Sequence, residues 1–296
     1  MLAVIGAVAM ISVSLFIRGR IDDNGNDDSE SSAPVKLACV TELASECSAL
    51  ASDKITITVE DATATLPKLD QYDGWLTFDP WPAMAALQQQ RAAKSSIALA
   101  SSPLQIAVVN DRATALTTAC GGSITWKCLG EKRGQQWSDL GGDATWGQLK
   151  VGLPSLQSAV GLLLYADAIA SYFGRTDYGT NDFDAEFIAW QSNVKASVGV
   201  ATLSSFVAGL PAVATAIGTT GAATSTGLGA KADRVAIVEE TARAVVVLAS
   251  TKGRNLRNLA NNVALRTALQ ADGWTDDANT ESGLPAPGVL LALLNG

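Results

Sequence analysis

The 296-residue chain contains no histidine. This absence excludes Ser-His-Asp and Cys-His activation of a nucleophile, zinc sites that need imidazole, and the usual general base near neutral pH. The sequence also lacks a GxSxG elbow, a Walker loop and a GxGxxG fingerprint. An enzyme built from it would be limited to carboxylate, lysine or tyrosine chemistry. We therefore expect no catalytic residue, no metal site and no cofactor.

Basic clusters are also scarce. The chain has 21 Lys and Arg against 29 Asp and Glu, a formal net charge of −8, and no large group of basic residues. Because nucleic-acid binding needs a basic face that neutralises phosphates, we expect no nucleic-acid partner. Hydrophobic residues make up 48% of the sequence, which is enough for a packed core, and the length allows two domains.

The four cysteines form two groups with equal spacing, Cys39 with Cys47 and Cys120 with Cys128, and no CxxC motif is present. Counting alone allows three connectivities. The equal local spacing, the missing metal-ligand pattern and an apparent export segment favour two short-range disulfides within these groups, in an oxidising compartment. The alternative is four buried thiols in a cytoplasmic protein.

The N-terminus predicts export. Residues 1–17 are apolar or small and are followed by Arg18 and Arg20; at helical rise they reach about 25 Å, short for a membrane span and long for a signal core. We assign residues 1–20 to a hydrophobic helix that acts as a signal or membrane anchor. The flanking arginines would place the body in the cytoplasm by the positive-inside rule, so export requires a basic leader before Met1. Residues 21–34 are acidic and rich in serine, which is typical of an extended linker.

Strand and helix patterns alternate from residue 35 onward, which predicts an α/β fold with a parallel sheet. The predicted strands are 35–40, 55–59, 74–78, 149–153, a small-residue strand within 204–223, and 235–249. The predicted helices are 41–51 with Thr41 as its cap, 63–69, 83–93, 156–168, 182–196 and 255–271, and an apolar turn or helix over 283–296. Residues 95–109 have β character on both sides of a Ser-Ser-Pro triplet and are predicted to cross between lobes. Residues 119–142 are predicted to be irregular and held by the second disulfide.

The stretch 146–174 is the strongest candidate for a site. A short apolar strand ends at Pro154, and Ser155 or Ser158 can cap the helix that follows. Such a helix start offers free N–H groups and hydroxyls to anions and polar ligands. The alternative is that both serines merely cap a helix packed on the sheet.

The order of elements resembles the type II solute-binding fold, the two-lobed receptors of ABC importers, and most resembles the molybdate and sulfate-like branch. The segments that carry the resemblance are VKLACVTELASEC, DGWLTFDPWP, SSPLQIAV, LKVGLPSLQSAVGLLLYADA, AVVVLAS and LANNVALRTALQADGW. The resemblance implies a first lobe from residues 35–105 and 233–296, a second lobe from residues 106–232, and a ligand cleft between them.

In this family, hydroxyls and helix-start N–H groups at strand ends hold the ligand, here predicted to be a small oxyanion or a sugar-like molecule. The residues that match are Thr41, Thr77, Asp79, Trp81, Ser102, Ser158, Ala159, Thr219 and Thr220. Trp81 lies between two prolines and is expected to be half-exposed, where it stacks on a sugar or covers the cleft; the alternative is that it covers the end of a sheet. Asp79 would repel an anion, unless it only bonds its own turn.

Three functions follow. The leading hypothesis is an extracytoplasmic, membrane-anchored or secreted receptor that captures a small ligand without covalent chemistry and delivers it to a membrane permease. The second is a surface sensor or interaction module on the same fold, with the tryptophan-rich disulfide loop 120–146 as its contact surface. The third is a glycoside hydrolase that uses two carboxylates, Asp73 and Asp79.

Overall fold

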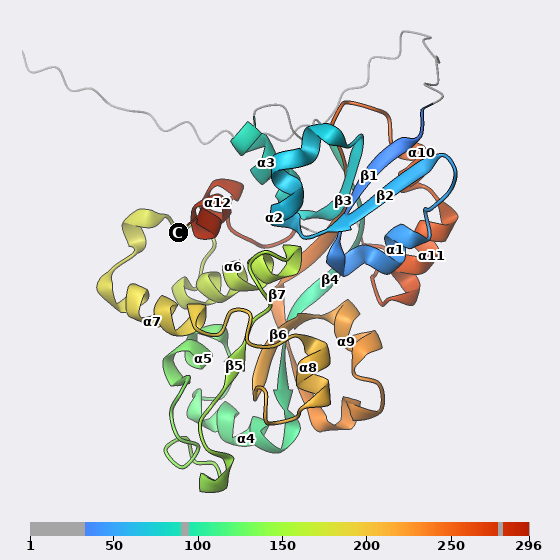
Figure 1. Ribbon diagram of the computed structural model, residues 1–296. Coiled ribbons are helices and arrows are strands. Elements are labelled where there is room, and N and C mark those ends of the chain that lie inside the picture. Colours follow the sequence, from blue (N-terminus) through green and yellow to red (C-terminus); the bar gives the residue numbers. More distant parts are fainter. Residues whose placement is uncertain (1–32, 90–94, 278–280, 296) are drawn as a thin grey trace, which may run out of the picture. The chain divides into compact units, whose positions relative to one another are not determined.

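The computed structural model describes residues 33–89, 95–277 and 281–295 (Figure 1). The predicted anchor 1–20, almost all of the linker 21–34 and the end of the predicted helix 83–93 lie outside the described residues. Residues Pro34–Gly296 form one compact unit. No helix among the described residues is long and apolar enough to cross a membrane.

A seven-stranded sheet in the order β2-β1-β3-β7-β4-β6-β5 organises this unit (Figure 1). The strands are β1 (Val35–Val40), β2 (Ile55–Glu60), β3 (Gly74–Asp79), β4 (Ser95–Val109), β5 (Val151–Gly152), β6 (Ala216–Thr220) and β7 (Val235–Ser250). The prediction of a parallel sheet is correct only toward its two ends, where β1 pairs with β2 and β3, and β5 pairs with β6. Every pairing that involves β4 or β7 is antiparallel.

The two long strands β4 and β7 join the two ends of the sheet. They pair along almost their whole length, with register shifts between Ala98 and Ala100 and between Pro103 and Gln105. Proline has no N–H to donate to the ladder, which explains an irregularity there. The last residues of β7 pair with β3, so the chain beyond Val235 returns to the side of its first strands, as the resemblance implies. The exact lobe boundaries stay a prediction.

Twelve α-helices are present in the described part of the chain. They are α1 (Ala44–Ser48), α2 (Ala62–Thr65), α3 (Trp81–Gln89), α4 (Asn110–Ala119), α5 (Trp126–Lys132), α6 (Ala159–Phe173), α7 (Ala185–Lys195), α8 (Leu203–Ala208), α9 (Gly221–Gly227), α10 (Arg257–Ala260), α11 (Val263–Ala271) and α12 (Pro287–Asn295). Short 3-10 turns lie at Thr41–Leu43, Leu66–Gln71, Ala144–Trp146, Thr180–Asp182 and Gly229–Arg234.

Two helix predictions need correction, and a further helix was not predicted. The predicted helix 41–51 is a 3-10 turn followed by α1, and Thr41 caps neither, because its hydroxyl lies against Asp61. The small-residue strand predicted within 204–223 is confirmed as β6, and helix α8, which was not predicted, lies before it. The predicted helix 255–271 is interrupted before α11, where the Asn262 side chain accepts hydrogen bonds from the backbone N–H groups of Ala264 and Leu265.

Helix α6 lies within the main core and directs its N-terminus to the candidate site. Its residues from Ala159 to Ile169 are all buried, so the helix is packed on every side. Gly174, in the left-handed conformation, ends it. A smaller apolar cluster that includes Phe206 and Ile217 packs under α8.

Both predicted disulfides are confirmed. Cys39–Cys47 ties the end of β1 to α1, and Cys120–Cys128 ties the end of α4 to α5. The predicted irregular loop around the second disulfide contains helix α5. Trp126 and Trp137 in that loop are fully buried, so these two side chains are not available as a contact surface.

Candidate ligand-binding cavity

A cavity of about 700 Å³ lies at strand ends and helix starts. Residues 41–61 and 272–274 form one wall, and residues 154–227 form the other, so its walls come from the two predicted lobes. Its lining consists of Thr41, Glu42, Ser45, Glu46, Asp61, Pro154, Ser155, Ser158, Val160, Thr202, Leu203, Ser204, Gly218, Thr219, Thr220, Ala222, Ala223, Thr226, Gly227, Asp272 and Trp274. Hydroxyl groups dominate the 154–227 wall, and all four acids belong to the other.

The start of α6 contributes one part of the hydroxyl wall. The Ser158 Oγ accepts from the Gly161 N–H at 3.0 Å and donates to the Ser155 carbonyl oxygen at 2.9 Å. The Val160 N–H donates to Glu42 Oε1 at 2.9 Å, and this bond joins one wall of the cavity to the other. A carboxylate of the protein therefore occupies the position at which a helix N-terminus favours an anion.

The start of α9 contributes a second part. Thr220 Oγ1 accepts from the Ala223 N–H at 3.1 Å, and Ser102 Oγ accepts from the Ala222 N–H at 2.7 Å. Thr219, only 4% exposed, lines the cavity, and its hydroxyl has no hydrogen-bond partner among the described residues. This hydroxyl can therefore donate to or accept from a ligand in the cavity.

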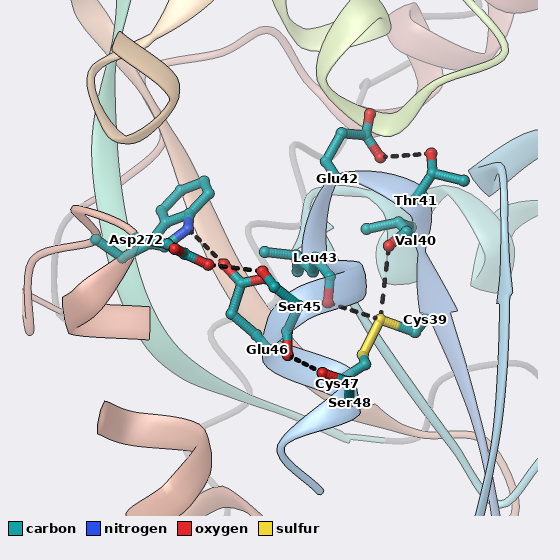
Figure 2. The surroundings of a disulfide bond; sticks show 11 residues. Cys39, Val40, Thr41, Glu42, Leu43, Ser45, Glu46, Cys47, Ser48 and Asp272 are labelled. Atoms are coloured by element: carbon teal, nitrogen blue, oxygen red, sulfur yellow. Dashed lines mark hydrogen bonds between the residues drawn. A yellow bond between two sulfur atoms is a disulfide. The ribbon is translucent and has the colours of Figure 1, made fainter. Parts of the chain in front are cut away.

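The acidic wall contains two hydroxyls, each placed between two carboxylates. The Thr41 Oγ1 lies 2.9 Å from Asp61 Oδ1 and 3.2 Å from Glu42 Oε2. A similar arrangement surrounds Ser45, near the Cys39–Cys47 disulfide (Figure 2).

The Ser45 Oγ lies 2.7 Å from Glu46 Oε2 and 2.6 Å from Asp272 Oδ2 (Figure 2). Glu46 is 1% exposed and also accepts from the Trp274 Nε1 at 3.0 Å. Burial raises the pKa of Glu46, and the charge of Asp272 adds to the rise, while the hydrogen bonds from Ser45 and Trp274 oppose it. This wall therefore combines concentrated negative charge with few hydrogen-bond donors.

Four of the nine predicted site residues line the cavity: Thr41, Ser158, Thr219 and Thr220. Ser102 and Ala159 lie behind the wall, where Ser102 holds the start of α9 and the Ala159 carbonyl oxygen accepts from the Trp81 Nε1 at 3.1 Å. Whether any of these residues binds a ligand stays a prediction.

Trp81, Thr77 and Asp79 do not line the cavity. The expectation that Trp81 is half-exposed is wrong: its ring is fully buried and packs edge-on against Trp75, with centroids 6.3 Å apart. Thr77 is fully buried because β3 lies inside the sheet with neighbours on both sides. Asp79 is partly buried, and this burial raises its pKa.

Sequence reasoning missed the acidic wall. Glu42 and Asp61 lie just after the ends of β1 and β2, so the rule that strand ends form the crevice could have selected them, and Glu46 lies in the helix α1 that comes next after β1. Asp272 and Trp274 follow α11, more than 200 residues away, and only tertiary structure brings them there.

The carboxylates of the glycoside hydrolase hypothesis lie elsewhere. Asp73 accepts from the Lys36 N–H at 2.9 Å and lies within ion-pair distance of Lys252 and Arg254. Neither Asp73 nor Asp79 is part of the cavity lining. The cavity therefore gives that hypothesis no support.

No protein-family model matches the chain, and no curated protein matches it. Among solved structures, iron-bound HitA from Pseudomonas aeruginosa aligns over 88% of this chain and 97% of its own length, with 12% identity and a TM-score of 0.56. The fold is the two-lobed type II solute-binding fold. The molybdate and sulfate-like branch stays a prediction.

Two further structures align less well. A hydrogen-peroxide-bound OxyR mutant from Corynebacterium glutamicum aligns over 81% of this chain with 12% identity and a TM-score of 0.49, and this chain covers 66% of it, just under two thirds. An ABC-type phosphate transport receptor from Vibrio cholerae aligns over 81% of this chain and 99% of its own length, with 14% identity and a TM-score of 0.46.

Proposed function

We propose that the chain is an extracytoplasmic receptor that captures a small polar solute between its two lobes for an ABC-type importer, without covalent chemistry. The observation that carries this proposal is the cavity of about 700 Å³, whose walls come from both predicted lobes and which lies at strand ends and helix starts. A cavity of this size suits a small molecule. The likeness in fold to iron-bound HitA agrees with a binding role.

The two disulfides support the extracytoplasmic location, because such bonds persist in oxidising compartments. The anchor and the permease are parts of the proposal that rest on the N-terminal sequence and on the resemblance. Co-purification of the full-length chain from membranes tests them, and recovery of a multi-spanning permease is the expected result.

Thermal unfolding of the full chain against oxyanions, sugars, amino acids and amines tests capture, because a ligand that binds only the folded state raises the melting temperature. A matched pair of variants assigns the response to the cavity. Ser204→Trp places an indole in the lining, whereas Ser192→Trp makes the same change on the exposed surface of α7. We expect a solute that stabilises the wild type and Ser192→Trp but not Ser204→Trp. Equal stabilisation of all three proteins would contradict capture in this cavity.

A further inference from the structure

The charge of the cavity lining is of one sign. Four carboxylates, Glu42, Glu46, Asp61 and Asp272, line it, and no lysine or arginine does. Within the described part of the chain, no basic side chain forms an ion pair with any of the four. An oxyanion entering this space would meet carboxylates that no basic side chain neutralises, whereas a cation would be attracted.

Backbone N–H groups at two helix starts, which could otherwise hold an anion, are already in use. At α6, the Val160 N–H bonds to Glu42 and the Gly161 N–H bonds to Ser158. At α9, Ala222 and Ala223 donate their N–H groups to Ser102 and Thr220. Both helix starts are therefore satisfied by the protein itself.

Acceptors, in contrast, are in excess. The hydroxyls of Thr41 and Ser45 each carry one proton but lie within hydrogen-bond distance of two carboxylates. The Thr219 hydroxyl, on the opposite wall, has no partner among the described residues, and Thr219 lines the cavity. A ligand that complements these walls brings several N–H donors and positive charge to the acids, and a polar group to Thr219.

A bare metal ion fits these observations less well. In the part of the chain that the structure describes, no group of three or more His, Cys, Asp or Glu side chains could hold one. The cavity volume of about 700 Å³ is also typical of pockets that bind an organic molecule.

We propose that the solute captured in this cavity is a small organic amine with more than one N–H-bearing group, and not an oxyanion. This inference rests on the proposed receptor function and specifies its ligand class. Asp61 and Asp272 bind the charged amine groups.

The test is calorimetric titration and thermal unfolding of the full chain with putrescine and spermidine, beside 1,4-butanediol, sulfate, molybdate, glucose and Ca²⁺. We expect saturable binding of at least one amine, and none of the others. Asp61→Asn and Asp272→Asn keep the shape of each side chain and remove its charge. Each is expected to weaken amine binding about tenfold or more, because each removes one hydrogen bond to a charged group. Asp70→Asn, an exposed position outside the lining, is the matched control and should bind as the wild type does.

Three results would overturn the inference, and they separate it from the receptor function. Binding of sulfate, molybdate or glucose, but of no amine, refutes the ligand class and leaves capture intact. Amine binding that is equal in the wild type, Asp61→Asn and Asp272→Asn places the amine outside the acidic wall. Binding of no solute refutes the amine proposal and counts against the receptor function as well.

Discussion

Gly161 allows the start of α6 to pack against the loop before it. Gly161→Ala should disrupt this packing and the cap of the helix. A Cβ at this position would lie 2.0 Å from the Ser155 carbonyl oxygen and 2.8 Å from the Ser158 Oγ. Real Cβ atoms essentially never approach other atoms within 3.0 Å, so the Ser155 carbonyl must move by at least 1.0 Å, the difference between 3.0 and 2.0 Å. That carbonyl accepts bonds from both the N–H and the Oγ of Ser158, so its movement also disturbs the helix cap.

Overpacking against backbone and a weakened cap together should cost about 3 kcal/mol. For a body of this size, that corresponds to a fall in melting temperature of about 6–12 °C. The matched control is Gly288→Ala on the exposed surface of α12, where no atom lies within 4 Å of the added methyl group. The control should leave stability unchanged or raise it by up to about 1 kcal/mol. Thermal and urea unfolding measure both variants, and equal stability of Gly161→Ala and the control would refute this account of the α6 start.

Three other changes have defined outcomes. Ser158→Ala removes the α6 cap and should lower the free energy of unfolding by about 1 kcal/mol; an unchanged urea midpoint would contradict the capping role. Replacing both Cys39 and Cys47 by Ala opens a link with a sequence separation of 8, which should cost about 2.5 kcal/mol of stability by loop entropy, seen as an earlier urea midpoint; no loss would mean that the link does not constrain the unfolded chain. Burial raises the pKa of the Asp167 carboxyl group well above its ordinary value, so its folded pKa exceeds its unfolded pKa and stability is lost as pH rises through the folded value. Asp167→Asn cannot ionise, so the difference in melting temperature between this variant and the wild type should shift in favour of the variant as the pH rises from 4 to 8. A difference that stays constant over this range would refute the prediction.

The fold was predictable because its signals are local. The strands β1, β2, β3 and β7 each lie within two residues of the predicted bounds, since apolar and β-branched residues define them. The mixed direction of the sheet was not predictable in this way, because the pairing of β7 with β3 and β4 joins segments far apart in the chain. Helix α8, which precedes the short strand β6, was not predicted.

In the candidate site, too, residues with a local sequence signal were predictable and residues placed by long-range contacts were not. Ser158 and Thr220 were predictable because they stand at helix starts, where hydroxyls cap the backbone. Trp81 misled because a tryptophan between two prolines suggests a stiff, accessible turn, while the structure buries its ring against Trp75. Asp272 carries no local signal, since its role depends on the contact with Ser45 across 227 residues of chain.

The two walls of the cavity differ in what they contribute to the fold. Ser158 and Thr220 each satisfy a backbone N–H at a helix start, so replacing either changes stability together with any effect on binding. Asp61 and Asp272 accept only from hydroxyls at the cavity wall and form no ion pair among the described residues, so their charge can be removed with little loss of structure. The hydroxyl wall is therefore tied to folding, whereas the acidic wall can vary with the ligand. Under the proposed receptor function, ligand specificity should accordingly be set at the acids and be separable from stability.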